Sequence, residues 1–196
     1  MNDRPKSICV YCASSRTCDP VYHDVARRLG GLLADLGVSI IYGGGAVGSM
    51  GALADGAVAR GGKIVGVLPK FMKDLEWGHP DLTELRVVED MRTRKHTMLA
   101  ESDGVVALPG GSGTLEELLE ALTLKRLGLY THPIVLVNTR DYFEPLVRLF
   151  EHAVAERFMD RRHLEMWQVV ASPEDVPAAL ESAPPWSASA REFAAV

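Results

Sequence analysis

Short apolar runs alternate with stretches of helical periodicity along most of the 196-residue chain. The runs predict strands at residues 7–11, 38–42, 63–68, 83–88, 104–108, 133–138 and 168–171. Several carry their apolar residues consecutively rather than alternately, as in Val105, Val106, Ala107 and Leu108. Consecutive apolar residues are typical of strands that are covered on both faces in a parallel sheet.

Helical patterns fill the intervals between these strands. The first helix is predicted from Pro20, with Asp19 as its N-cap and Gly37 as its end. Others are predicted at residues 48–60, 90–101, about 115–128, 142–158 and 174–181. Alternating strands and helices predict an α/β fold with a Rossmann-like, doubly wound, mostly parallel sheet and helices on both faces. We expect one domain over residues 1–182, then a disordered tail over residues 183–196, which are rich in Pro, Ala and Ser.

Composition and charge narrow the possible partners. Lys and Arg number 21 against 26 Asp and Glu, which gives a net charge of −5. A general binder of nucleic acid polymers normally has a surplus of basic residues, so this class is disfavoured. No apolar run approaches the roughly 20 residues that a membrane span needs. The first residues are polar and lack the apolar stretch of a signal peptide, so we expect a cytoplasmic protein without a membrane partner.

Three cysteines raise the question of a metal site. Cys9 and Cys12 form a C-x-x-C pattern, and Cys18 and His23 follow closely, so a zinc site is conceivable. Cys9 falls inside an apolar run, however, and buried free cysteines behave as small hydrophobic residues. We therefore expect a role in the core, no metal and no cofactor.

Two glycine loops follow predicted strands and precede predicted helices. The candidate ligand-binding residues in them are Gly43, Gly44, Gly45, Gly110, Gly111, Ser112, Gly113 and Thr114. Glycine admits positive φ and close approach of a ligand, and a helix N-terminus offers free N–H groups and a partial positive charge. Glycine clusters can also be simple tight turns, but two such loops in one sheet favour a phosphate site.

A dinucleotide is a poorer match to the first loop, although Gly43, Gly45 and Gly48 fit G-x-G-x-x-G. This loop follows the second strand, and no acidic residue ends the next strand to hold a ribose. A mononucleotide or sugar phosphate fits better.

The predicted helix at 90–101 begins with cations. Arg92, Arg94 and Lys95 lie near its N-terminus, where the helix dipole disfavours positive charge. Such residues can form a solvated basic face, but the neighbouring glycine loops favour a bound anion. Ser14, which follows the first strand, either contacts the ligand or holds the turn, and Trp77 packs either on a base or in the core.

Glu117 is the candidate carboxylate beside the second glycine loop. It lies three residues after Thr114, which is the spacing of a capping box, so it can serve merely to cap the helix. The alternative is a carboxylate held within reach of the ligand.

Two motifs carry a resemblance to a known family. Residues 109–117, PGGSGTLEE, match P-G-G-x-G-T-x-x-E, and residues 91–95, MRTRK, match M-x-x-R-K. With the glycine stretch at 42–51 and the opening VYCASS at 10–15, the chain resembles the LOG (Lonely Guy) family over roughly residues 7–180. These are cytokinin riboside 5′-monophosphate phosphoribohydrolases, long labelled lysine decarboxylases.

The resemblance implies a homodimer that hydrolyses the N-glycosidic bond of N6-modified AMPs, often with AMP itself. It implies that Glu117 and Arg94 are catalytic, that Gly110, Gly111, Gly113 and Thr114 hold the phosphate, and that Met91 and Lys95 lie beside the site. A non-catalytic nucleotide sensor is the alternative from another class, because it needs the glycine loops but not Glu117.

Overall fold

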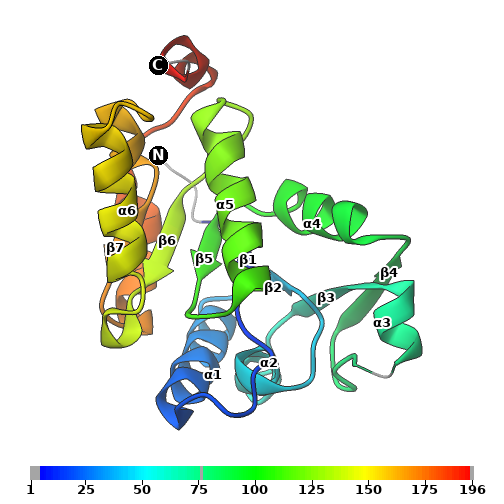
Figure 1. Ribbon diagram of the computed structural model, residues 1–196. Coiled ribbons are helices and arrows are strands. Elements are labelled where there is room, and N and C mark those ends of the chain that lie inside the picture. The colour runs from blue at the N-terminus through cyan, green and yellow to red at the C-terminus, as the bar shows by residue number, and fades with distance from the viewer. Residues whose placement is uncertain (1–4, 76, 195–196) are drawn as a thin grey trace.

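The computed structural model describes residues 5–75 and 77–194, and these residues form a seven-stranded, all-parallel sheet (Figure 1). The strands are β1 Ser7–Tyr11, β2 Ser39–Tyr42, β3 Ile64–Pro69, β4 Glu84–Val88, β5 Val105–Ala107, β6 Ile134–Val137 and β7 Gln168–Val170. Their order is β4-β3-β2-β1-β5-β6-β7. All seven predicted strands are confirmed. The apolar residues of the five inner strands are buried as a parallel sheet requires, whereas Val87 on β4 and Val169 on β7, the two edge strands, are exposed.

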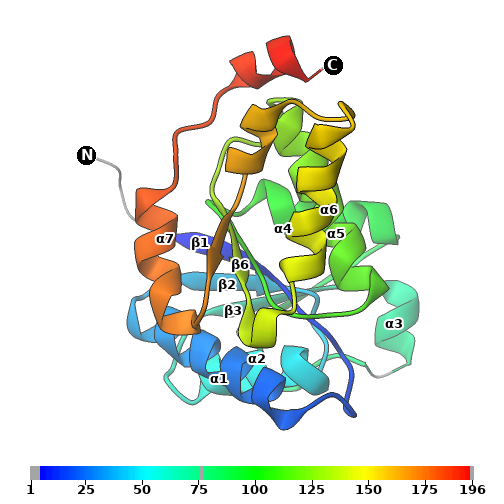
Figure 2. The same ribbon diagram turned by 60° about the vertical axis from the view of Figure 1, so that its left-hand side comes forward.

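Helices cover both faces of the sheet (Figures 1 and 2). One face carries α1 Pro20–Asp35, α2 Gly48–Val58 and α7 Val176–Ser182, and the other carries α4 Met91–Ala100, α5 Ser112–Arg126 and α6 Glu144–Ala155. Alternate residues of β1 enter the two cores: Ile8 packs in the first and Cys9 in the second. The Rossmann-like, doubly wound fold is therefore confirmed. Among the described helices, none has the length and apolar character needed to cross a membrane.

The strand order reverses direction beside β1. The chain moves outward from β1 to β4, then returns through α4 to place β5 on the other side of β1. The loops after β1 and β5 therefore diverge, which leaves a crevice at the carboxyl ends of these strands. Ligands of doubly wound sheets bind at this kind of switch point.

Helices α1 and α2 cross in close contact. A Cβ on Gly30 would lie 2.1 Å from the carbonyl oxygen of Leu53, and one on Gly56 would lie 2.0 Å from that of Arg27. Only glycine fits at either position, so the two backbones touch. This contact fixes α2, whose N-terminus follows the first glycine loop.

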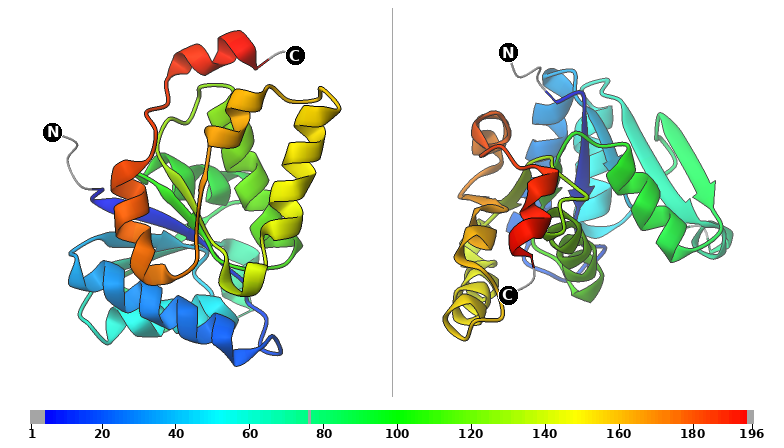
Figure 3. Two further views of the ribbon diagram at one scale, coloured as in Figure 1. Left: turned by 90° about the vertical axis from the view of Figure 1, so that its left-hand side faces the viewer. Right: turned by 90° about the horizontal axis from the view of Figure 1, so that it is seen from above.

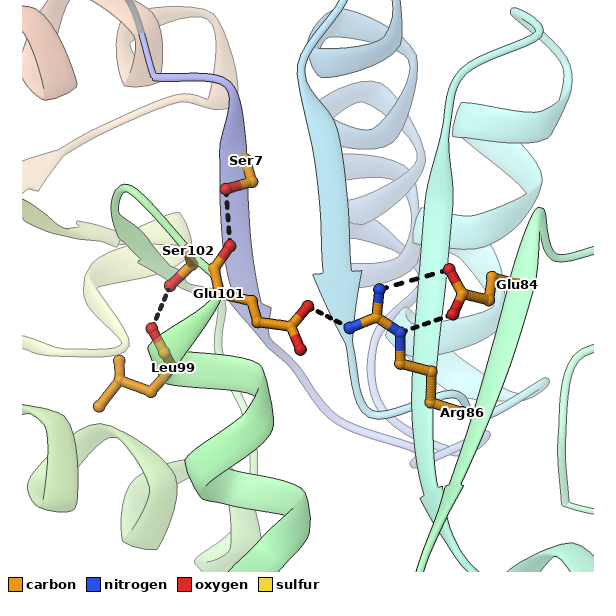
Figure 4. Close-up of polar contacts among 6 residues, drawn as sticks. All are labelled: Ser7, Glu84, Arg86, Leu99, Glu101 and Ser102. Carbon is orange, nitrogen blue, oxygen red and sulfur yellow. Dashed lines mark hydrogen bonds and ion pairs between the residues drawn. The ribbon is translucent and has the colours of Figure 1, made fainter.

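Polar contacts at the amino end of the sheet anchor α4 (Figure 4). The Arg86 guanidinium on β4 pairs with Glu84, at 2.7 Å, and with Glu101, which directly follows α4. The Ser7 hydroxyl at the start of β1 donates to the Glu101 carbonyl oxygen at 2.8 Å. Because the end of α4 is held at the amino end of β1, its first turns face the carboxyl end, where the crevice lies.

The C-terminal segment differs from the expected disordered tail (Figure 3). Within the described part, residues 183–194, the Trp186 indole donates to the carbonyl oxygen of Lys125 at 2.7 Å. The Arg162 guanidinium lies 3.9 Å from the Phe193 ring centroid, and residues Ala188–Phe193 form a 3-10 helix. Two aromatic anchors suffice to dock a segment that lacks an apolar period; residues 195–196 lie outside the described part.

Candidate functional site

A cavity of about 750 Å³ opens at the carboxyl ends of β1, β2, β3 and β5. The structure brings together ten of the predicted site residues in its lining: Ser14, Gly43, Gly45, Met91, Arg94, Gly111, Ser112, Gly113, Thr114 and Glu117. Three other predicted residues, Gly44, Gly110 and Lys95, lie outside the described lining. The cavity is large enough for a nucleotide, since small-molecule sites commonly enclose about 300–1,000 Å³.

A buried ion pair forms the centre of this site. Nη1 of Arg94, from α4, donates to Oε1 of Glu117, from α5, at 2.9 Å. Both side chains are only 6% exposed, and both border the cavity. A pair so far removed from water has the shielded, charged character of a reaction centre rather than of a surface contact.

Arg94 is held by two more hydrogen bonds besides the ion pair. Its Nε donates to the Val67 carbonyl oxygen at 3.0 Å, and its Nη2 donates to that of Gly43 at 3.2 Å. A Cβ on Gly43 would lie 2.0 Å from Nη2, so glycine is required there for the guanidinium to fit. The first glycine loop therefore serves to seat Arg94 as well as to border the cavity.

Glu117 has a perturbed acidity. Burial raises the pKa of its carboxyl group, and the nearby positive charge of Arg94 opposes this effect without cancelling it. Glu117 therefore holds a proton to a higher pH than an ordinary glutamate. A carboxyl group tuned in this way inside a cavity is a candidate for acid–base or charge-stabilising chemistry.

The capping role considered for Glu117 is wrong. Helix α5 begins at Ser112 with Gly111 as its N-cap, so Thr114 already lies inside the helix. No side chain caps this terminus. The first N–H groups of a helix have no partner within it, so this terminus presents free donors to the cavity.

A tyrosine from a distant segment braces the second glycine loop. The Tyr142 hydroxyl donates to the Gly110 carbonyl oxygen, 32 positions away in the chain. Gly110 thus helps to fix the second glycine loop through this bond, although it is not among the described residues that line the cavity. The sequence carried no signal for Tyr142, because its contact is to a main-chain oxygen of another element.

Lys95 has a different environment from the one expected. Its ammonium group pairs with Glu116 and, at 2.7 Å, with Glu120, both on α5. These two carboxylates raise the pKa of Lys95 through hydrogen bonds. Lys95 thus links α4 to α5 beside Arg94, and its charge is already balanced by protein groups.

One side of the cavity is apolar and was largely missed. Leu68, Met72 and Trp77 come from β3 and the segment after it, and Met50 comes from α2. Trp77 remains 53% exposed, so it borders the cavity rather than packing in the core. Arg16, after β1, is a further cation in the lining.

The cysteines do not share a site. Cys9 and Cys12 are buried in the cores on opposite faces of the sheet, as small hydrophobic residues would be. Cys18 instead lies 3.2 Å from Nε2 of His23. Among the described residues, no cluster of His, Cys, Asp and Glu could hold a metal ion.

Comparisons with known proteins agree with the motifs. A family model described as a possible lysine decarboxylase matches residues 50–180. A cytokinin riboside 5′-monophosphate phosphoribohydrolase of Rhodococcoides fascians is 43% identical over 156 residues, which are 79% of each chain. A protein of the same name from Arabidopsis thaliana is 41% identical over 157 residues, 80% of this chain and 72% of its own.

Solved structures share the fold at lower identity. A molybdenum cofactor binding protein of Rippkaea orientalis has a TM-score of 0.69 at 23% identity, covering 93% of this chain and 98% of its own. The molybdenum cofactor carrier protein of Chlamydomonas reinhardtii has a TM-score of 0.66 at 23% identity, covering 89% and 95%. These likenesses establish the fold of the whole domain.

Proposed function

The chain belongs to the LOG family of cytokinin riboside 5′-monophosphate phosphoribohydrolases, and from this premise we propose how its cavity performs that hydrolysis. The enzyme cleaves the N-glycosidic bond of N6-modified adenosine 5′-monophosphates to a free base and ribose 5-phosphate. We extend this activity to AMP itself. The observation that carries the proposal is the buried Arg94–Glu117 pair, which borders the cavity close to the uncapped N-terminus of α5.

The substrate phosphate lies at the N-terminus of α5. Gly111, Ser112 and Gly113 border the cavity there, and the helix offers free N–H donors and a partial positive charge. Arg16 supplies a full charge on the same cavity. With the phosphate held there, the ribose reaches Glu117, which lies in the second turn of the same helix.

The reaction adds water across the bond between C1′ and the base nitrogen. The water oxygen bonds to C1′, the electron pair of the broken bond goes to the base, and the base takes a proton. Positive charge develops on the ribose ring in such reactions, as in glycoside hydrolysis. Ionised Glu117 stabilises this charge and orients the water, and the enclosed position strengthens both effects.

Arg94 holds Glu117 in place for this step. Its three bonds, to Glu117, Val67 and Gly43, fix the guanidinium and hence the carboxylate relative to the cavity. A planar group with donors in fixed directions suits this task better than a lysine ammonium.

Lysine decarboxylation does not fit these residues. A pyridoxal phosphate enzyme needs a lysine in the cavity to form the Schiff base. No lysine occurs among the described lining residues, and the adjacent Lys95 is paired with Glu116 and Glu120.

The test is release of free base from defined nucleotides. Purified protein is incubated with AMP and with N6-isopentenyl-AMP, and base, ribose 5-phosphate and inorganic phosphate are measured. We expect base and ribose 5-phosphate in equal amounts and no inorganic phosphate. Tight binding of both nucleotides without base release would instead support a nucleotide sensor.

We also propose a homodimer that acts in the cytosol. Leu119 on α5 is 41% exposed, and Leu127 and Leu129, which follow this helix, are 37% and 67% exposed; these apolar side chains support a contact with a second copy. The three free cysteines accord with a reducing compartment. Light scattering during gel filtration measures the mass, and a monomer at micromolar concentration would argue against the dimer.

A further inference from the structure

A short segment after α3 Lys70–Asp74 pairs with the first glycine loop. The Ala46 N–H donates to the Trp77 carbonyl oxygen at 3.1 Å, and the His79 N–H donates to that of Gly44 at 3.0 Å. Gly45 and Gly78 face each other between these bonds as an antiparallel bridge. We call residues 77–79 the strap, because they lie across the loop that seats Arg94.

His79 anchors the strap through a side chain that is 6% exposed. The Asp81 N–H donates to its Nδ1 at 3.2 Å, so Nδ1 is the unprotonated nitrogen of the neutral ring. Nε2 therefore carries the proton and donates to Oδ1 of Asp55 at 3.2 Å. Both ring nitrogens are thus engaged, and the ring orientation is fixed.

Asp55 connects this anchor to the rigid part of the fold. It lies on α2, the helix whose backbone touches that of α1 at Gly30 and Gly56. Partial burial raises the pKa of Asp55, but hydrogen bonds from His79 and Arg27 outweigh this and lower it, so the carboxylate stays ionised. The strap is therefore tied to α2 by a charged acceptor.

We propose that His79 is a positioning residue, which together with Asp55 holds the strap so that Trp77 forms the wall of the cavity against the substrate base. The inference rests on the proposed function, since it assigns a subsite within the same cavity. His79 acts through the main chain: fixing its ring fixes the strap, and the strap presents the Trp77 ring two residues earlier.

The polar and apolar residues that line the cavity lie in different parts of it, and the apolar part is the one that suits the base. The N-terminus of α5 is the part that suits the phosphate, whereas Leu68, Met72 and Trp77 form an apolar side. A purine is the flat, weakly polar part of the substrate, and stacking on an aromatic side chain is worth about 1–3 kcal/mol per base. The half-exposed Trp77 ring offers such a surface.

Two substitutions separate the hydrogen bonds of His79. In His79→Gln the terminal amide N–H can replace the Nε2 proton and keep the bond to Asp55. In His79→Asn the amide oxygen can replace Nδ1 and keep the bond from Asp81, but the link to Asp55 is lost. We expect His79→Asn to raise KM for AMP by about tenfold or more, and His79→Gln to stay within about threefold of wild type.

Inhibition by ribose 5-phosphate distinguishes positioning from general damage. This product lacks the base and does not reach Trp77, so its inhibition constant should be unchanged in both variants. Trp77→Ala, which removes an exposed side chain, should likewise raise KM for AMP by about 5- to 100-fold and leave that constant unchanged. Trp77→Ala therefore tests whether Trp77 contacts the base even if a His79 variant fails to fold.

Arg27→Gln is the matched control, because Arg27 also pairs with Asp55, at 3.0 Å, but at the surface. It should leave both constants unchanged. The inference is overturned if His79→Asn and Trp77→Ala retain the wild-type KM, or if ribose 5-phosphate binding falls in parallel with AMP binding. Failure of the proposed function looks different, because wild-type protein would then release no base at all.

Discussion

Glu117→Gln separates the chemistry of the site from its stability. The amide keeps the shape of the side chain, and its oxygen can still accept the hydrogen bond that Arg94 Nη1 donates at 2.9 Å. It carries no charge to stabilise the developing positive ribose. Groups of this kind commonly contribute about 10²–10⁴-fold, so we expect kcat to fall by that factor, with KM for AMP changed little.

The same substitution should not destabilise the fold. Removing one member of a buried ion pair usually costs about 3–5 kcal/mol. Here, however, burial raises the pKa of Glu117 even with Arg94 beside it. A carboxyl group whose pKa is higher in the folded than in the unfolded state stabilises the fold when the pH is below the unfolded-state pKa. This contribution is lost as the pH rises through the folded-state pKa. Ionised Glu117 therefore costs stability at neutral pH, and the neutral amide avoids this cost.

Urea unfolding at pH 7 measures this directly, in parallel with base release from AMP. We expect Glu117→Gln to unfold at an equal or higher midpoint, and the difference from wild type to shrink as the pH falls below about 4.3, the usual pKa of glutamate. Glu120→Gln, the same change one turn further along α5 on a 40% exposed side chain, is the control and should alter little. A loss of more than about 2 kcal/mol in Glu117→Gln would refute the reasoning, as would near-normal turnover.

Four further outcomes follow from the structure. Adenosine should be a poorer substrate than AMP, because phosphate binding at α5 positions the ribose, and equal base release from adenosine would contradict this. ATP should also be a poor substrate, because the site has no evident room for two more phosphates. Arg94→Lys should abolish most activity, since one ammonium cannot replace bonds to Val67, Gly43 and Glu117, and full turnover would mean that charge alone matters. The kcat–pH profile should fall on the acid side with a midpoint above the usual glutamate pKa, because Glu117 must be ionised; a midpoint near 4 would remove it from that role. Deleting residues 183–196 removes aromatic packing worth roughly 3 kcal/mol and should therefore lower Tm by about 6–12 °C, while activity at 25 °C persists. An unchanged Tm would show that the segment does not dock.

Much of the fold was predictable because it rests on continuous apolar runs. Strands such as β5 and β6 can be identified in the sequence because each has three or four consecutive apolar residues, all of which are buried in the structure. Helix α3 has five residues with none buried, so it leaves no periodic signal to find. The docked C-terminal segment was missed for a related reason: Trp186 and Phe193 are isolated aromatic residues without a repeating pattern.

The candidate site was predictable where short motifs carried it. The two motifs identified Arg94 and Glu117 as candidates, but only the structure shows that the two side chains form an ion pair. Tyr142 was missed because its hydroxyl bonds a main-chain oxygen of a distant segment, and His79 because its ring bonds Asp55, 24 positions away; no local spacing reveals either contact. Lys95 was assigned to the ligand because its partners on α5 are 21 or more positions away.

The seating of Arg94 has a kinetic consequence for folding. Its three hydrogen bonds span 23, 27 and 51 positions of sequence, to Glu117, Val67 and Gly43. Each bond forms only after α4 has packed against the element that holds its partner, which is β3, the first glycine loop or α5. Contacts of such separation form only after long loops have closed. Arg94 should therefore contribute little to the folding transition state, with a φ-value near zero, so that changes in its contacts alter the unfolding rate rather than the folding rate. These three bonds at the centre of the cavity are then expected to form after the folding transition state and to be lost before it on unfolding.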